Sequence, residues 1–460
     1  MPATQATLSD ILKEFYLGPV QEQLNNEVMV LDLMTKTTVD WNGRVAIIPI
    51  HVSRNTGVAF AAESGLLPAA GDQGYQRLQV NAHFLYGRFQ ITGPAMSAAG
   101  KGGANSFIGW MEAEMDKLVN DVKNASDNAM ISGGRVLGFL NEHKVVAGGA
   151  AAFTNWEMFG DVEKAEQLRA AVVAAGSTEL LVDLVRVDRN AALGYTVIPN
   201  CVQIALNGTD VIGRTISLED VDLNGAGAAY TTAVTDDGFG IAVVVSTAQQ
   251  AAPATAVTNN LDQQPQGIFA NLGSRAHFGV NRFSPASATE FPVLQSTIIT
   301  QVVGGAQTRA ALSLPRMQAT MDQVSQLSGN EPDCILISPL ARQQYAALFQ
   351  LTAGTSATVM NTSGERANKL DGGFSGLSYG GLPIKTARHV GGGGMIFLKL
   401  STWKVLELEA HGFADLDGSV LARAGVGAAG IDAYEGYYRW YYNTVTTNPN
   451  QNAILCGFSV

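Results

Sequence analysis

The clearest periodic pattern in the chain lies between residues 105 and 132. Apolar side chains recur there at steps of three and four positions, with polar residues between them: Phe107, Met111, Met115, Leu118, Val122, Ala125 and Ala129. Gly133 and Gly134 follow and end the pattern. The sequence therefore predicts a long helix of roughly seven turns at 3.6 residues each, which can act as a structural spine.

Two strand-like segments precede this helix, at residues 43–60 and 75–93, and a tip rich in glycine and alanine joins them. In the second segment the apolar residues alternate with more polar ones: Leu78, Val80, Ala82, Phe84 and Tyr86. We interpret residues 43–93 as one extended hairpin with one apolar face. An isolated two-stranded hairpin is marginal in water, so this face needs a partner.

Helical and strand patterns divide the rest of the chain. Residues 8–34 predict two short helices separated by Gly18-Pro19, which are too isolated to form a domain and indicate an N-terminal arm. A helix at 161–174 and an apolar strand at 179–187 follow the spine. Residues 195–260, rich in Thr, Val, Gly and Asn, predict a small β insertion.

The last third predicts a helix–strand–helix unit and then more strands. Ser313 is the expected N-cap of the first helix, with Pro315 in its first turn and Gly329 at its end. The strand "CILIS" and a helix from Pro339 complete a compact α/β lobe. Three strand-like stretches, at 395–410, 437–447 and 452–460, are expected to pair as one antiparallel sheet on the spine helix.

Composition narrows the partners. The 460 residues are 46% hydrophobic and 15% charged, and the net charge of −11 disfavours a surface that grips nucleic acid or an anionic membrane. Cys201, Cys334 and Cys456 lie far apart, which favours buried thiols over a disulfide or metal site. The chain shows no secretion signal and no apolar run near the ~20 residues that span a bilayer, so we expect cytoplasm-like conditions.

Motifs for chemistry are incomplete. "GLSYG" around Ser378 matches a hydrolase elbow, but a glycine-rich loop precedes it and Pro383 follows, so an ordinary turn is favoured. Gly100-Lys101 lacks the pattern of a phosphate loop, and "DLDGS" at 415–419 lacks the distal ligands of a calcium loop. The histidines never lie at zinc-ligand spacing. We therefore expect no catalytic, cofactor or metal site, and a structural protein rather than an enzyme.

Four phrases and the order of the elements carry a resemblance. The phrases are "ESGLLP" from Glu63, "QGIFANLG" with "FGVNRFSPASATEFPV" from Gln266, "EPDCILISPLARQQYAAL" from Glu331 and "YGGLPIKTARHV" from Tyr379. In this order they resemble the major capsid protein of tailed bacteriophages, which has the Hong Kong 97 type fold. The resemblance covers nearly the whole chain.

The resemblance implies an α+β fold with six parts. They are an N-terminal arm (1–42), an extended loop formed by the hairpin (43–93), a peripheral domain with the spine helix (94–194), a β-rich insertion (195–262), an axial domain (263–390) and C-terminal strands of the peripheral domain (391–460). Hexamers and pentamers would then build an icosahedral shell around double-stranded DNA, which they contact without sequence specificity. The resemblance implies a virion protein that is assembled in the host cytoplasm.

In this interpretation the hairpin lies over a neighbouring subunit, which covers its apolar face. The expected intersubunit contact residues are Glu63, Leu66, Leu67, Arg77, Phe84, Tyr86 and Arg88. Pairing of Glu63, Arg77 or Arg88 with a neighbour would set the register. Solvated charges are the simpler interpretation, because exposed ion pairs contribute only about 0–1 kcal/mol.

Two departures from the family add expectations. Some relatives lock the shell with an isopeptide bond from an extended-loop lysine, but residues 43–93 contain no lysine, so we predict a non-covalent shell. The hairpin begins at residue 43, which leaves no room for a fused scaffold segment, so a separate scaffold protein or none is expected. Portal and decoration proteins are further conceivable partners.

Three alternatives stay open. An encapsulin-like nanocompartment shell shares the fold and holds protein cargo, although the β insertion favours the phage interpretation. A tail-tube subunit would form tubes, and a hydrolase would use Ser378.

Overall fold

The computed structural model describes most of the chain. The described residues are 30–38, 41, 43, 45–63, 65–94, 97, 104–142, 156–175, 180–186, 197–210, 215–220, 241–246, 260–274, 276–282, 291, 294–300, 302–303, 306–307, 310–353, 377–415, 422–423 and 432–458. Most of the predicted N-terminal arm lies outside them. Its last part forms the short helix α1 (Val30–Leu33).

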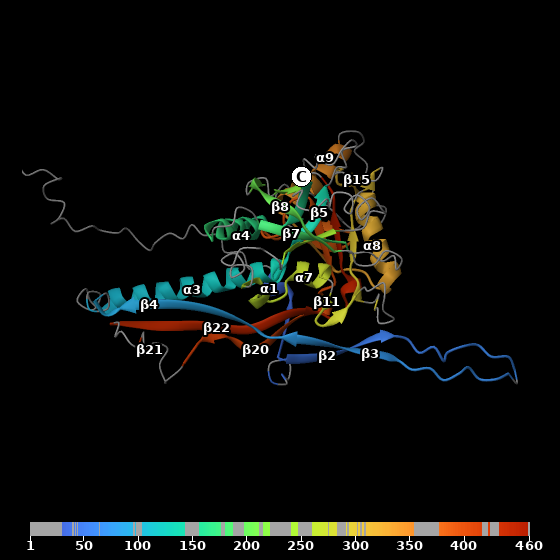
Figure 1. The fold of residues 1–460 in the computed structure, drawn as a ribbon, viewed down its shortest axis with the longest axis horizontal. Helices are drawn as coiled ribbons and strands as arrows, with labels where there is room; N and C mark the ends of the chain where they lie inside the picture. Colours follow the sequence, from blue (N-terminus) through green and yellow to red (C-terminus); the bar gives the residue numbers. More distant parts are fainter. Residues whose placement is uncertain are drawn as a thin grey trace, which may run out of the picture.

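The predicted spine helix is confirmed as α3 (Ala104–Ser132), which lies along a long sheet (Figure 1). In that sheet β20 (Trp403–Phe413) lies between β1 (Thr35–Thr38) and β22 (Ala433–Thr446). β22 also pairs with β4 (His83–Thr92) and with the short β21 (Ala422–Arg423). Helix and sheet meet closely at Gly87 of β4, where an added Cβ would lie 2.8 Å from Val122 of α3.

The buried stripe of α3 differs from the predicted one near the end of the helix. Ala125 is exposed, whereas Ser126 and Asp127 are buried. The reason is polar: the Asp127 carboxylate accepts hydrogen bonds from the backbone amides of Val30 and Leu31, at 2.8 and 3.0 Å. The helix therefore uses a buried acid to hold the first turn of α1, which an apolar period cannot reveal.

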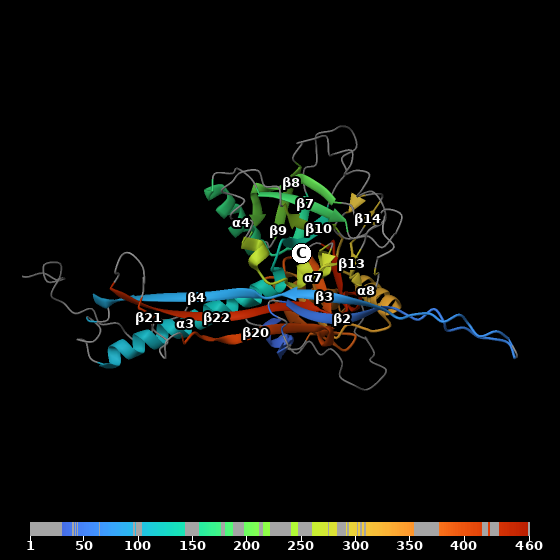
Figure 2. The same cartoon turned by 60° about the horizontal axis from the view of Figure 1, so that its bottom comes forward.

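The predicted hairpin is confirmed in its outer part. β2 (Val45–Ser53) and β3 (Gly74–Asn81) pair antiparallel from Val45↔Asn81 to Ser53↔Gly74. We call residues 45–81 the projecting hairpin and residues 54–73 its tip. Figures 1 and 2 show that it runs out beyond the rest of the molecule, away from α3 and β4.

The returning strand is not continuous, in contrast to the prediction. It breaks at Ala82, and β4 leaves β2 to pair with β22 instead. The buried positions are even-numbered in β3, as at Leu78 and Val80, and odd-numbered in β4, as at Phe89 and Ile91. One residue out of phase exchanges the two faces of a strand. Phe84 and Tyr86 therefore lie on the exposed face of β4 and not on a continuation of the Leu78 face.

The β-rich region is part of a closed barrel rather than a separate insertion. Its strands β8 (Val197–Asp210), β9 (Thr215–Asp220) and β10 (Ile241–Val245) pair with earlier strands: β5 (Val136–Glu142), β6 (Trp156–Gly160) and β7 (Leu180–Arg186). The boundary predicted at 194/195 thus falls inside the barrel. Because the barrel is closed, none of its described strands has an unpaired edge. This closure depends on pairing between strands that are distant in sequence. Helix α4 (Val162–Ala174), predicted at 161–174, follows β6.

A second sheet forms the core of the lobe that contains the predicted helix–strand–helix unit. Its order is β13 (Thr297–Ile299), β23 (Ala453–Cys456), β19 (Gly394–Leu398), β16 (Cys334–Ile337), β18 (Leu382–Thr386) and β17 (Ser378–Tyr379). Helices α8 (Leu314–Ser328) and α9 (Pro339–Ala353) flank β16 in the chain, as predicted. Gly329 ends α8 with a left-handed φ of +72°, and Ser313 occupies the N-cap position.

The predicted single C-terminal sheet is wrong for two of its strands. The stretch 395–410 divides at the 3-10 turn η3 (Leu400–Thr402) into β19 and β20, and β19 pairs with β23 in the second sheet. Only β20 and β22 join the sheet on α3. Asn452 stabilises the turn between β19 and β20, because its Oδ1 atom accepts hydrogen bonds from the Lys399 amide at 2.9 Å and from the Trp403 indole at 2.8 Å.

Candidate functional site

The tip of the projecting hairpin exposes its large apolar side chains. The exposed fractions are 84% for Val58, 108% for Phe60, 97% for Leu66 and 86% for Leu67. Glu63 beside them is exposed too. No described part of the chain covers these side chains. Exposed apolar groups that cluster in this way mark a site of interaction rather than a free surface.

The two sides of the tip lie close together although they form no strands. The Gly57 amide donates to Asn55 Oδ1 at 2.6 Å, and a Cβ added at Gly57 would lie 2.7 Å from the Ala69 carbonyl oxygen. This close approach requires glycine. The tip is therefore a narrow, two-sided extension with its apolar side chains outward.

The base of the hairpin is anchored. Its buried side chains Ala46, Ile50, Leu78 and Val80 belong to one cluster with Leu406 and Val445 of the long sheet. Phe278, Val280 and Leu294, from the segment that follows α7 (Ile268–Gly273), complete this cluster. Asn443 of β22 donates through Nδ2 to the Asn81 carbonyl at 2.7 Å. The base of the hairpin is thus packed against the rest of the chain, whereas its tip is exposed to solvent. Arg77, on β3, is exposed.

A second exposed surface, the aromatic face, consists of Phe84 and Tyr86 of β4 with Tyr437, Arg439 and Tyr441 of β22. Phe84 lies opposite Tyr441 and Tyr86 opposite Arg439 in the strand register. The Phe84 and Tyr441 rings are 4.9 Å apart in an edge-to-face arrangement, and the Tyr86 and Tyr441 hydroxyls are 3.0 Å apart. Phe84 and Tyr86 stay 53% and 57% exposed. This is the sheet face opposite the one that packs on α3.

Arg88 forms its ion pair within its own chain. Its guanidinium contacts the Glu435 carboxylate, which also accepts a hydrogen bond from the Tyr437 hydroxyl. These contacts, with Tyr437 the stronger, lower the pKa of Glu435. A second pair, Arg439–Glu409 at 2.6 Å, lies on the same face. Among the described residues no ion-pair partner of Glu63 or Arg77 is found.

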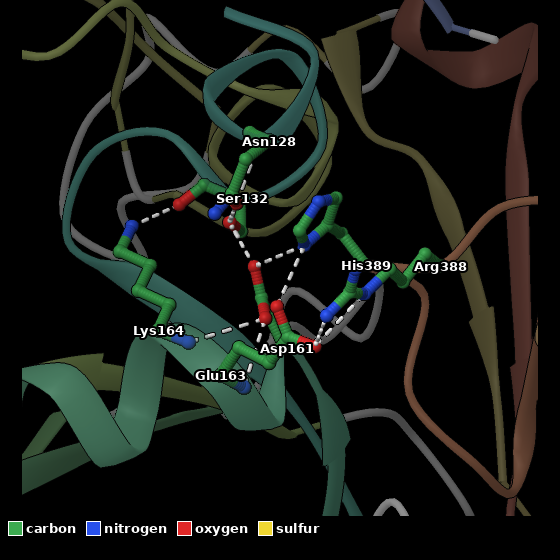
Figure 3. Close-up of polar contacts among 7 residues, drawn as sticks. All are labelled: Asn128, Ser132, Asp161, Glu163, Lys164, Arg388 and His389. Atoms are coloured by element: carbon green, nitrogen blue, oxygen red, sulfur yellow. Dashed lines mark hydrogen bonds and ion pairs between the residues drawn. The ribbon is translucent and has the colours of Figure 1, made fainter. Parts of the chain in front are cut away.

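A separate group of polar residues, which we call the buried joint, lies where α3, the barrel and the second sheet meet: Ser132, Asp161, Glu163, Lys164, Arg388 and His389 (Figure 3). Asp161 is its centre and only 1% exposed. Its Oδ1 atom accepts from the amides of Glu163 and Lys164 at 3.1 and 3.2 Å, which caps α4. Its Oδ2 atom accepts from the Ser132 hydroxyl at 2.7 Å.

The buried joint ties three parts of the fold together. Ser132 ends α3, Asp161 follows barrel strand β6, and Arg388 and His389 belong to the turn between β18 and β19 of the second sheet. Arg388 donates to Glu163 Oε1 at 2.8 and 3.0 Å. The backbones meet closely here too, since a Cβ added at Gly391 would lie 2.0 Å from the Gly160 oxygen.

The charges of the buried joint shift each other. Burial alone would lower the pKa of His389, but the carboxylates of Asp161 and Glu163 raise it above its usual value. Burial would raise the pKa of Asp161, but His389, Ser132 and the Lys164 amide lower it. Burial lowers the pKa of Lys164 to about 8. The Lys164 ammonium donates to the carbonyls of Ser132 and Gly134 at the end of α3.

The sequence motifs for chemistry do not assemble into a site. Ser378 lies on β17, which turns through Gly380 and Gly381, at φ +56° and +84°, directly into β18. A hydrolase elbow needs a helix after the serine, so this geometry contradicts one. Cys334 and Cys456 are buried free thiols, as predicted, whereas the side chain of Cys201 and Gly100-Lys101 lie outside the described part. No group of potential metal ligands occurs among the described residues.

The same residues include no helix that is long and apolar enough to cross a membrane.

The predicted contact residues thus fall on two surfaces. Glu63, Leu66, Leu67 and Arg77 lie on the projecting hairpin, and Phe84, Tyr86 and Arg88 lie on the exposed side of β4. The buried joint was missed by the sequence reasoning. Each of its residues is ordinary in its local segment, and only the fold brings Asp161 and His389 together.

Comparison with solved structures identifies the fold. The chain is similar to a chain of the cyanophage A-1(L) capsid asymmetric unit, with a TM-score of 0.54, 10% sequence identity and coverage of 100% of both chains. It is also similar to the capsid of a native GTA particle, at a TM-score of 0.47 and 10% identity over 100% of this chain and 99% of that one. A structure of Gordonia phage Cozz follows at 0.45 and 8%, over 99% and 94%.

No protein-family model and no curated protein matches the chain. At 10% identity the similarity to the cyanophage capsid chain concerns the fold alone, and it extends over the full length. The α+β capsid fold predicted from the sequence is therefore confirmed.

Proposed function

We propose that this chain is the major capsid protein of a tailed bacteriophage and assembles into the hexamers and pentamers of an icosahedral shell. The observation that carries the proposal is the projecting hairpin, on a chain with a capsid fold. Its base is packed into the core, and its tip presents Phe60, Leu66 and Leu67 to solvent. A tip of this kind is stable when another copy covers it.

The contact is head-to-tail. The tip and the aromatic face are different surfaces, and the hairpin points away from α3 and β4, so the described part of the chain does not cover its own tip (Figure 1). A tip that docks on a different surface of the next copy makes a heterologous contact, and such contacts form a ring when the rotation between successive copies closes. Fully burying a leucine side chain contributes roughly 1.5–3 kcal/mol, so Leu66 and Leu67 would stabilise each such contact appreciably.

We assign Glu63, Leu66, Leu67 and Arg77 to the docking side of this contact. Phe84, Tyr86 and Arg88 are assigned to a receiving side, because their face is aromatic and exposed. Edge-to-face aromatic groups such as Phe84 and Tyr441 offer a firm apolar surface with hydroxyls at its rim. Arg88 contributes to this receiving side as one half of an ion pair, since Glu435 neutralises its charge.

Double-stranded DNA is the proposed content of the shell. The net charge of −11 suits a container that does not hold densely packed DNA tightly at every contact. Assembly in the host cytoplasm and separate scaffold, portal or decoration proteins belong to the same proposal.

Electron microscopy of the full chain, expressed alone and purified, tests the proposal. We expect closed spherical shells or rings of capsomer size. Tubes or a strictly monomeric protein would contradict it. If shells purified from cells that produce phage contain protein cargo and no DNA, this would support a nanocompartment instead.

A further inference from the structure

We propose that the short hairpin β11–β12 (Ala276–His277 and Val280–Asn281) is a clamp that sets the direction of the projecting hairpin. Phe278 is its positioning residue. The consequence for assembly rests on the proposed function, whereas the clamp itself is a property of the single chain. Figure 1 shows β11 beside the base of the projecting hairpin.

Phe278 adopts an unfavourable backbone conformation. Its φ is +47°, the only positive φ of a non-glycine residue in the described part of the chain, and Gly279 follows at +88°. A bulky residue is rare in this region, where glycine or asparagine is comfortable. The backbone conformation at this position does not favour phenylalanine, so we attribute the residue to the contacts of its side chain.

The ring of Phe278 is 6% exposed and packs in the cluster that contains Ala46, Ile50, Leu78 and Val80 of the projecting hairpin. The backbone holds the same strand, since the Gln79 amide donates to the Phe278 carbonyl at 3.0 Å. Phe278 thus grips β3 through both its side chain and its main chain.

The clamp is itself fixed to the core. The His277 side chain is fully buried, and its Nε2 atom lies 2.8 Å from the Thr446 carbonyl of β22, to which it donates. Its Nδ1 atom accepts from the Arg282 guanidinium at 2.9 Å. Burial and then the charge of Arg282 lower the pKa of His277, which keeps the imidazole neutral for these two hydrogen bonds.

Arg282 completes the link. Its guanidinium donates to the Leu272 carbonyl at 2.9 Å and to the Asn271 carbonyl, both in α7 (Ile268–Gly273). The connection therefore runs from α7 and β22 through His277 to Phe278 and the hairpin. A small rotation at this base would be amplified at the distant tip, so a fixed base places the tip before it docks and reduces the ordering cost of association.

Electron–electron distance measurements between two spin labels test the clamp. The labels are placed at exposed positions, by Arg54→Cys at the start of the tip and Gln326→Cys on α8, in a chain with Cys201→Ser. A large excess of unlabelled chain makes the measurement valid in free and in assembled protein. We expect Phe278→Ala to widen the distance distribution at least twofold, and Phe278→Leu to restore most of the native width.

Two further variants separate the causes. Phe278→Gly relieves the backbone but removes the ring, so it should widen the distribution as Phe278→Ala does. Leu184→Ala in barrel strand β7 also removes a buried apolar side chain but should leave the width unchanged. An unchanged width in both Phe278→Ala and Phe278→Gly overturns the clamp, as does equal widening in Leu184→Ala. Failure of the wild type to form shells would refute the proposed function but leave this distance test intact.

Discussion

The imidazole Nδ1 of His389 lies 3.6 Å from Oδ2 of Asp161, in the seam where the barrel meets the second sheet. The same nitrogen is 4.0 Å from Glu163 Oε2, and Asp127 contributes at longer range. Arg388 and Lys164 are the other cationic residues of the buried joint, beside the carboxylates of Asp161 and Glu163. Besides the Arg388–Glu163 pair, the seam therefore contains a His389–Asp161 ion pair that exists only while the histidine is protonated.

The buried joint should make stability depend on pH. Because the folded-state pKa of His389 is raised above 6.5, its contribution is complete below pH 6.5 and is lost as the pH rises through the raised value. The contribution of His389 to the free energy of unfolding of the wild type should therefore fall across this interval. His389→Gln should flatten that part of the profile when urea unfolding is measured at a series of pH values.

The matched control is His51→Gln, since His51 is an exposed histidine on β2. It should leave the pH profile of the wild type intact. A wild-type profile that is unaffected by His389→Gln would show that the pair contributes nothing measurable.

Asp161 has two roles that substitutions can separate. Asparagine keeps the cap of α4 but removes the charge that faces His389, whereas alanine removes both. We expect Asp161→Ala to unfold more easily than Asp161→Asn by about 1 kcal/mol, the usual value of an N-cap. Equal stabilities in chemical denaturation would mean that the cap is not used.

How far the sequence predicts this fold depends on how local the information is. The extent of α3 and the boundaries of α8 at Ser313 and Gly329 are determined by neighbouring residues, and both were predicted correctly, although the buried stripe of α3 was not. The closed barrel and the division between β19 and β20 depend on pairing with distant strands. The phase change at Ala82 has the same origin, because β4 pairs with the distant β22 and buries the side that faces α3.

The candidate contact residues show the same limit. Leu66 and Leu67 were predictable as bare apolar side chains in a glycine-rich tip. Arg88 was not predictable as a partner of Glu435, and the buried Asp161–His389 pair has no sequence signal at all. Electrostatic partners from distant segments become visible only when the backbone is folded.

The close contact between α3 and β4 should be sensitive to volume. A Cβ at Gly87 would lie 2.8 Å from Val122 and 3.1 Å from Leu118. Gly87→Val should therefore lower the free energy of unfolding by about 1–3 kcal/mol through overpacking. Gly412→Val on β20 is the control, because nothing lies within 4 Å of the position where its Cβ would be. Comparable losses in both variants would contradict overpacking as the cause.

The hairpin tip should matter for assembly and not for folding. Leu66→Ser together with Leu67→Ser removes apolar groups that are exposed in the single chain, so the unfolding midpoint should not change. If a neighbour buries each leucine, assembly loses a free energy of roughly 1.5–3 kcal/mol per side chain. Light scattering should show a large rise in the concentration needed for shells. Normal assembly of the double variant would remove the tip from the contact.

The shell should come apart completely under denaturing conditions. A covalent lock from the hairpin needs a lysine amine, and residues 43–93 contain only Arg44, Arg54, Arg77 and Arg88 as cations other than histidine. A guanidinium stays protonated and does not attack an amide or carboxyl group as a free amine does. Purified particles boiled in detergent should therefore run as one band near 48.4 kDa. A ladder of larger species would contradict this prediction, because it would show that residues outside the hairpin form a covalent bond between subunits.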